Sequence, residues 1–257
     1  MGKGVVMDLS GRVALVTGGS RGIGRACCLM LAEAGARVAV NYRSDVGAAA
    51  EVVETIRLGG GDAIALRADV ADAGEAHRLV QDAARRWGRL DIVVNNAGVW
   101  TGGSIETLSD ETLGETIGIN LRGPFHVTRS AVPHLKRSPG GGRVIFISST
   151  AGQRGEADHS HYAATKGALI SLTKSLSPEL APHRILVNCV APGWVDTDMS
   201  AGSLAGEGRA QIASTIPLRR VGTPEEVASA VVFLASDLAT FITGEILNVN
   251  GGAVLCG

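Results

Sequence analysis

The sequence predicts an α/β fold in which one doubly wound parallel sheet carries helices on both faces. Two observations predict it. Short apolar runs alternate with longer amphipathic segments along the whole chain, and a glycine-rich turn follows the first apolar run. The chain is 45% hydrophobic but only 4% aromatic. Its core must therefore come from small aliphatic side chains, which suit packed layers. We expect about seven strands in a single domain that spans residues 1–257.

Continuous apolar runs are typical of strands that are buried on both faces of a parallel sheet. The first run, RVALVT, has this form, and so does the second, RVAVNY. Seven segments of this kind are predicted as strands: residues 12–17, 37–42, 63–66, 91–95, 143–148, 185–190 and 245–249.

Helices are predicted between the strands, at residues 21–34, 47–58, 74–87, 109–136, 160–181 and 224–235. Gly35 ends the first helix as a C-terminal cap, and Ser109 is a good N-cap for the fourth. Pro178 is expected to kink or shorten the fifth, because proline lacks the N–H of the helical hydrogen bond. Residues 193–222 are glycine-rich and irregular, with one or two short helices. We interpret them as a substrate loop.

In a doubly wound sheet, ligands bind beyond the carboxyl ends of the strands. The loop after the first strand places glycine at 18, 22 and 24. Glycine lets a backbone turn tightly and approach a diphosphate, which the N–H groups of the following helix then bind. The spacing G-x-x-x-G-x-G differs from the standard G-x-G-x-x-G, and a plain tight turn is the alternative. Its place between strand and helix favours a Rossmann-type dinucleotide site.

The residues after the second strand indicate which dinucleotide binds. An NAD site usually has an acid there, but this strand ends Asn41-Tyr42-Arg43-Ser44, and Asp45 comes later. Arg43 and Arg21 instead suit a 2′-phosphate, because a guanidinium makes paired charged hydrogen bonds. The sequence favours NADP(H) over NAD(H). Arg43 as a solvated surface charge is the alternative.

A tyrosine and a lysine form the candidate catalytic pair. Tyr162 and Lys166 are four residues apart on a predicted helix and share a face. A nearby ammonium favours a phenolate, so we expect Lys166 to lower the pKa of Tyr162. Ser149 lies just past the fifth strand, where the sheet would place a substrate. A surface pair is the alternative for the Y-x-x-x-K spacing taken alone.

Together these segments resemble the short-chain dehydrogenase/reductase family. The matches occur in the family's order over nearly the whole chain: TGGSRGIG at 17–24, Asp69-Val70, NNAG at 95–98, Asn120, Ser149, YAATK at 162–166 and PGWVDT at 192–197. Within the family the pattern is most similar to 3-oxoacyl-[acyl-carrier-protein] reductases of fatty acid biosynthesis. Leu186 departs from it, because the family often has Arg there.

The resemblance implies a catalytic tetrad of Asn120, Ser149, Tyr162 and Lys166. Tyr162 would donate the proton to a carbonyl oxygen, Ser149 would orient that oxygen, and Lys166 would bind ribose hydroxyls and tune Tyr162. Asn120 would hold a water for proton resupply. Ser148 is the less favoured candidate for the catalytic serine.

The resemblance also implies the cofactor contacts. Asp69 and Val70 would edge the adenine pocket, Asn95 would brace the sheet, and Thr197 would bind the carboxamide. The full expected set is Gly18, Ser20, Arg21, Gly22, Ile23, Gly24, Tyr42, Arg43, Ser44, Asp69, Val70, Asn96, Ala97, Gly98, Tyr162, Lys166, Pro192, Gly193, Val195 and Thr197.

Several side chains near these motifs have plainer interpretations. His159 and His161 flank the tyrosine, and we expect polar loop residues at the pocket rim, not metal ligands. Trp100 and Trp194 either line a substrate pocket or pack loops. Residues 200–208 form either a mobile lid or an uninformative surface loop.

Charge and composition exclude other classes of function. The formal net charge is −1, so a nucleic-acid partner is not expected. No apolar run reaches about 18 residues and no secretory signal is evident, which predicts a cytoplasmic protein with no membrane partner. The four cysteines, Cys27, Cys28, Cys189 and Cys256, are expected to be reduced thiols, and no metal site is expected.

The first functional hypothesis is an NADPH-dependent carbonyl reductase that acts on a small molecule or acyl thioester, with a 3-oxoacyl thioester as the first candidate. The alternatives are a sugar or secondary-alcohol dehydrogenase and a non-catalytic nucleotide-binding protein. The resemblance further implies a homotetramer that assembles through its long helices.

Overall fold

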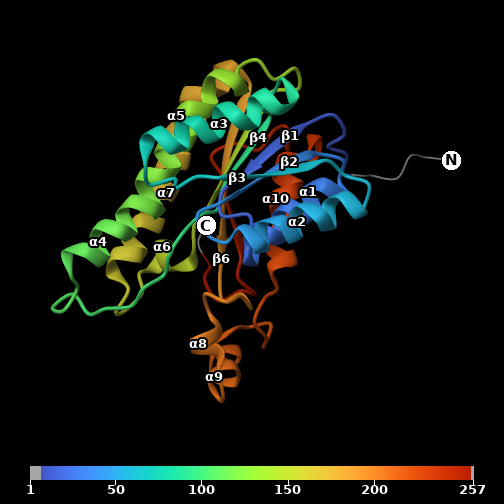
Figure 1. Cartoon of the computed structure of the whole chain (residues 1–257). Coiled ribbons are helices and arrows are strands. Elements are labelled where there is room, and N and C mark those ends of the chain that lie inside the picture. The colour runs from blue at the N-terminus through green and yellow to red at the C-terminus, as the bar shows by residue number, and fades with distance from the viewer. Residues whose placement is uncertain (1–6, 256–257) are drawn as a thin grey trace.

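The computed structural model describes residues 7–255, and Cys256 lies outside that range. One parallel sheet runs through the molecule with strand order β3-β2-β1-β4-β5-β6-β7 (Figure 1). All seven predicted strands are confirmed: β1 (Val13–Val16), β2 (Arg37–Tyr42), β3 (Ala63–Arg67), β4 (Ile92–Asn95), β5 (Gly142–Ile147), β6 (Ile185–Pro192) and β7 (Ile246–Val249). The order reverses between β1 and β4, so the crevice for a ligand opens there.

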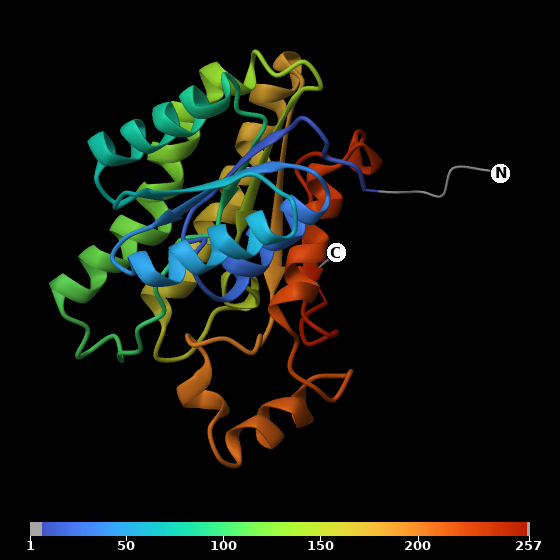
Figure 2. The ribbon, with the colours of Figure 1, turned by 45° about the vertical axis from the view of Figure 1, so that its right-hand side comes forward.

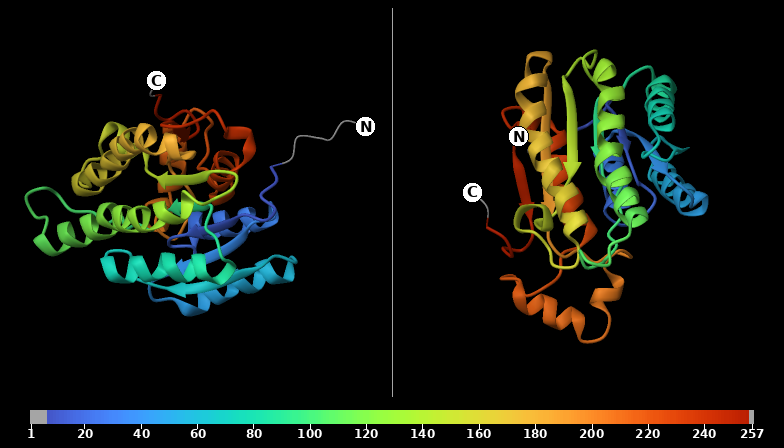
Figure 3. Two further views of the ribbon diagram at one scale, coloured as in Figure 1. Left: turned by 90° about the horizontal axis from the view of Figure 1, so that it is seen from above. Right: turned by 90° about the vertical axis from the view of Figure 1, so that its left-hand side faces the viewer.

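Helices cover both faces of the sheet (Figure 3). One face packs against α1 (Gly22–Glu33), α2 (Val46–Leu58) and α10 (Pro224–Ala235). The other packs against α3 (Ala73–Trp87), α5 (Gly123–Leu135) and α7 (Ser160–Leu180). The predicted doubly wound fold is therefore confirmed.

Strand β1 shows why its sequence is apolar at every position. Ala14 and Val16 belong to the core under α1 and α10, whereas Val13 and Leu15 belong to the core under α3 and α5. All four are fully buried. Successive side chains of a strand point to opposite faces, so a strand with two covered faces needs two apolar sets.

The prediction of one continuous helix at 109–136 is wrong. It is divided into α4 (Asp110–Ile117), a π-helical segment (Gly118–Arg122) and α5. Pro124 accounts for the break, because it lacks the N–H that would bond the carbonyl of Asn120 in a regular α-helix. Single π-helical turns within helices are frequent at functional sites, and this one carries Asn120.

Two further departures from the predicted helices follow β5 in the chain. A short helix that was not predicted, α6 (Thr150–Arg154), follows β5 with Ser149 as its N-cap. Helix α7 continues through Pro178 to Leu180, so the proline does not end it early. The irregular segment 193–222 contains α8 (Ala201–Leu204) and α9 (Gly208–Thr215), which stand away from the sheet below its carboxyl edge (Figure 2).

A buried carboxylate stabilises the opposite, amino edge of the sheet. Asp91 is fully buried and accepts two hydrogen bonds of 2.7 Å from the guanidinium of Arg89. It also accepts from the Val13 N–H at 2.9 Å and from the Ser138 hydroxyl at 2.5 Å. This one side chain therefore joins the starts of β1 and β4 to the turn before β5.

We expect Asp91→Ala to destabilise the protein by about 2–4 kcal/mol, because it leaves buried donors without acceptors. The free energy of unfolding in urea measures this. The control is Arg85→Ala, which removes an exposed pair with Asp82 and should cost less than about 1 kcal/mol. Equal effects of the two substitutions would contradict the role given to Asp91.

Candidate active site

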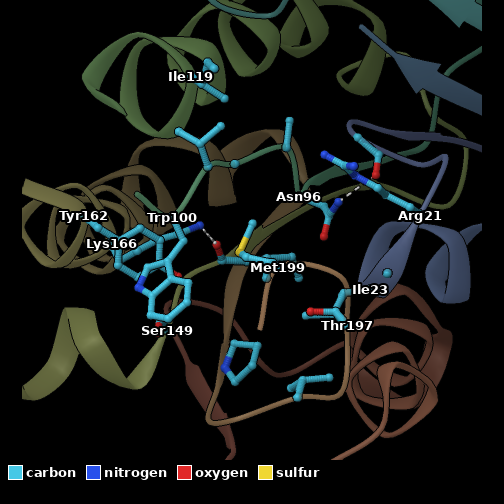
Figure 4. A pocket seen from close by; sticks show the side chains of 18 of the residues that line it. Arg21, Ile23, Asn96, Trp100, Ile119, Ser149, Tyr162, Lys166, Thr197 and Met199 are labelled. Atoms are coloured by element: carbon cyan, nitrogen blue, oxygen red, sulfur yellow. Dashed lines mark hydrogen bonds between the residues drawn. The ribbon is translucent and has the colours of Figure 1, made fainter. Parts of the chain in front are cut away.

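A cavity of about 550 Å³ opens along the carboxyl edge of the sheet. It extends from the loop after β1 to Tyr162 and to the segment after β6 (Figure 4). Every predicted catalytic and cofactor-binding residue lines this cavity except Asn120 and Gly24. The structure thus brings the predicted residues together from six strand ends and from α7.

The loop after β1 requires glycine for two separate reasons. Gly18 and Gly22 have positive φ of 60° and 52°, where other residues are strained. A Cβ on Gly24 would stand 2.1 Å from the carbonyl oxygen of Gly18. Gly24 therefore lies behind the cavity wall and lets α1 pack directly on the loop.

The N-terminus of α1 is available to an anion. Its N-cap, Arg21, makes no side-chain capping bond, and the first turn carries no acidic residue. Free N–H groups and the helix dipole favour an anion at such an end. This end faces the cavity beside the positive-φ glycines, so the residues present fit a dinucleotide diphosphate.

Amide side chains hold this loop in place. Asn96 Nδ2 donates to the carbonyls of Thr17 and Gly18 at 2.9 and 3.0 Å, and Asn41 Oδ1 accepts from the Gly18 N–H at 3.1 Å. Asn95 Nδ2 donates to Thr128 Oγ1 at 3.1 Å, which ties β4 to α5. These asparagines at the carboxyl ends of β2 and β4 thus hold the backbone at this edge of the sheet in place.

The adenosine end of the cavity carries the two predicted arginines. Arg21 is exposed, and Arg43 forms a half-exposed pair with Glu115 at 3.4 Å. Asp45, the first acid after β2 in the sequence, caps α2 by accepting from the Ala48 N–H at 2.9 Å. Asp69 similarly accepts from the Ala71 N–H at 2.9 Å. Both carboxylates are therefore already engaged by backbone.

Lys166 and Ser148 fasten α7 to the end of β5. Lys166 Nζ donates to the carbonyl of Ile147 at 2.8 Å and lies 5.6 Å from the ring centre of Tyr162. Ser148 Oγ donates to the carbonyl of Lys166 at 2.7 Å. Ser148 is thus used in docking the helix, whereas Ser149 caps α6, where its Oγ accepts from the Ala151 N–H at 3.1 Å, and it lies close enough to Tyr162 to act on the pKa of that phenol. The geometry favours Ser149 as the catalytic serine.

Asn120 reaches the site from the π-helical segment. Its amide bridges the backbone of Val99, accepting from the N–H at 2.8 Å and donating to the carbonyl at 2.9 Å. A Cβ on Gly98 would meet Asn120 Oδ1 at 3.3 Å and Lys166 Nζ at 3.5 Å. Three members of the predicted tetrad line the cavity, and Asn120 stands directly behind Gly98.

Burial dominates the ionisation of the catalytic pair. Burial raises the pKa of Tyr162 to about 12, although the hydrogen bond from Ser149 lowers it. The predicted lowering of the Tyr162 pKa is therefore wrong in its net direction, because the phenolate loses more by desolvation than it gains from its neighbours. Burial also lowers the pKa of Lys166 to about 8. Tyr162 is thus a firmly protonated phenol at neutral pH.

Of the two histidines, His159 lies in the loop before α7 next to the cavity wall, as predicted, whereas His161 does not. His161 is buried within α7, and neither ring nitrogen has a hydrogen-bond partner among residues 7–255. His159 is the N-cap position of α7, and its ring stacks on Trp100. Trp100 and Trp194 both line the cavity, as do the side chains of Arg154, Glu156 and Met199, which were not predicted.

Residues 7–255 hold no group of three or more histidine, cysteine and acidic side chains placed to bind a metal ion. No helix in that range combines the length and apolar character needed to cross a membrane.

Comparisons with known proteins agree with this geometry. A family model described as enoyl-(acyl carrier protein) reductase matches residues 18–254. The 3-oxoacyl-[acyl-carrier-protein] reductase FabG of Staphylococcus aureus is 42% identical over 239 residues, which cover 93% of this chain and 96% of the relative.

Solved structures extend the likeness to the fold. A dehydrogenase/reductase from Sinorhizobium meliloti has a TM-score of 0.92 at 39% identity and covers 97% of each chain. A short-chain dehydrogenase from Burkholderia cenocepacia, solved in complex with NADP, has a TM-score of 0.90 at 39% identity and covers 95% of this chain and 98% of its own. The chain therefore belongs to the short-chain dehydrogenase/reductase family and is an oxidoreductase of CH–OH and C=O groups.

Proposed function

We propose that this protein reduces a ketone with NADPH and that Tyr162 donates the proton. The observation that carries this proposal is a protonated, buried phenol beside Ser149, in the same cavity as the uncapped N-terminus of α1. A 3-oxoacyl thioester is the first candidate substrate, because the Staphylococcus aureus relative is named for one. We place the protein in the cytoplasm as a homotetramer.

The nicotinamide supplies the hydride when it is bound, and the chain's own residues do the rest. Tyr162 gives the proton of its phenol oxygen to the substrate carbonyl oxygen, while Ser149 donates a hydrogen bond that orients that oxygen. The Lys166 ammonium favours the phenolate that remains. Positioned proton donation of this kind contributes about 10²–10⁴ in rate.

The cofactor preference rests on charge. Arg21 and Arg43 both line the adenosine end, and guanidinium groups bind phosphate through paired, charged hydrogen bonds. The acids that could instead bind ribose hydroxyls are engaged by backbone N–H groups. The Burkholderia cenocepacia neighbour with NADP supports the same preference.

Tyr162→Phe should lower kcat at least about 100-fold with acetoacetyl-CoA, because phenylalanine has no proton to give to the carbonyl oxygen. The measurement is the rate of NADPH oxidation, with NADPH affinity as the check on folding. Ser149→Ala should also lose activity, whereas Ser148→Ala should keep it within about tenfold.

Full activity of Tyr162→Phe would refute its role, and turnover only in the oxidative direction with alcohols or sugars would favour the alternative dehydrogenase. No turnover of any substrate would favour a nucleotide-binding protein.

Arg43→Ala should raise the KM for NADPH about tenfold or more and leave the KM for NADH nearly unchanged. The reason is that only NADPH carries a 2′-phosphate. Steady-state kinetics with both cofactors measures the effect. Parallel changes for the two cofactors would argue against a phosphate contact at this residue.

The pH dependence of kcat/KM should follow Lys166 and not Tyr162. The lysine is charged below its pKa of about 8 and neutral above it, so kcat/KM for reduction should fall on the alkaline side of pH 8. The phenol stays protonated up to about pH 12 and adds no limb below that. In the residual activity of Lys166→Arg this limb should vanish, since an arginine keeps its charge. An unchanged limb in that variant would assign it elsewhere.

A further inference from the structure

An indole ring stands beside the phenol that we assign as the proton donor. Trp100 packs against the small apolar cluster of Ala151, Tyr162 and Ala163. Trp100 and Tyr162 also line the same cavity, as the close view shows (Figure 4). A substrate carbonyl placed at Tyr162 would therefore have its substituent within reach of a flat aromatic surface.

Three side chains, from two other segments of the chain, hold this indole in one orientation. His159 stacks on it with ring centres 4.5 Å apart and planes 9° from parallel. Trp194 meets it edge to face at 5.8 Å and 89°. Trp100 Nε1 donates to Glu156 Oε2 at 3.4 Å. A wall that is already ordered loses little conformational entropy when a ligand binds to it.

The charges at this end of the cavity do not favour an anionic substrate. Arg154 is accompanied by Glu156 and Asp198, and all three line the cavity. An acidic carrier protein or a phosphate tail would meet no excess of cations there. Apolar and aromatic side chains, including Trp194 and Met199, line the same region.

We propose that the site selects ketones whose carbonyl carries a flat, conjugated ring, and that this ring lies against the indoles of Trp100 and Trp194. The proposal rests on the ketone reduction proposed above and names a substrate class in place of the 3-oxoacyl thioester, which was taken from the name of a relative. Aromatic pairs attract each other beyond the apolar area that they bury, so a flat ring gains more from this wall than a puckered one of equal size. If the tryptophans only packed loops, flat and puckered rings would gain equally from binding at this site.

The test compares acetophenone with 1-cyclohexylethanone, which have the same number of heavy atoms but a flat and a puckered ring. Intrinsic reactivity differs between them, so the readout is the ratio of their kcat/KM values in each variant. Trp100→Leu should lower the acetophenone-to-cyclohexylethanone ratio about five- to tenfold, and Trp100→Phe should restore most of it. Trp194→Leu provides a second variant in case Trp100→Leu does not fold.

The matched control is Trp87→Leu, which removes an indole in α3 that is not part of the cavity wall. It should leave the ratio unchanged. A ratio that is the same in the wild type, Trp100→Leu and Trp194→Leu would overturn the proposal.

A binding measurement separates failure of this proposal from failure of the proposed reaction. Calorimetry compares 1-phenylethanol with 1-cyclohexylethanol, with and without NADP⁺. Tighter binding of the phenyl alcohol that is lost in Trp100→Leu supports the aromatic wall, even if no ketone is turned over. Equal binding of the two alcohols overturns the aromatic wall, whatever the outcome for turnover.

Discussion

The active site depends on the docking of α7 against the end of β5. Lys166 donates from its ammonium to the carbonyl of Ile147, and its own carbonyl accepts from Ser148. A Cβ on Gly152 would lie 2.5 Å from the carbonyl carbon of Lys166, so α6 also packs directly on the backbone of α7. These contacts fix Tyr162 relative to Ser149, although the two residues come from different elements. Catalysis by a positioned donor needs this fixed relation, because small displacements are costly in rate.

The same docking explains the ionisation of the pair. The docking of α7 buries the ammonium of Lys166 away from water. The lost hydration is offset only in part, by the hydrogen bond to the carbonyl of Ile147. Tyr162 is buried with it and keeps its proton. An acid for carbonyl reduction must hold its proton until the oxygen needs it, and a buried phenol does so. In the reaction that we propose, the ammonium of Lys166 would then reduce the cost of the phenolate once the proton has left.

Sequence patterns predicted the parts that repeat a simple physical rule. A parallel sheet requires apolar runs, and a tight turn between strand and helix requires glycine, so β1 and the turn at Gly18 and Gly22 could be predicted, whereas the packing role of Gly24 behind the cavity wall could not. The π-helical segment was not, because helical periodicity alone does not show how Pro124 alters the hydrogen bonding around Asn120. The direction of the Tyr162 pKa also needed the structure, since burial is a property of the assembled fold. The stack of His159 on Trp100 joins two loops with no sequence relation to each other.

The cavity has two halves that are built in different ways. The dinucleotide half is built mainly from backbone: positive-φ glycines, a helix terminus, and asparagine amides that hold them. Side chains there can change little without disturbing the loop. The substrate half is built from side chains of three loops that meet at Trp100. Replacing an aromatic residue in those loops would alter the wall and leave α7 docked on β5. The chemistry is thus fixed by the fold, while the choice of ketone depends on a few exchangeable rings.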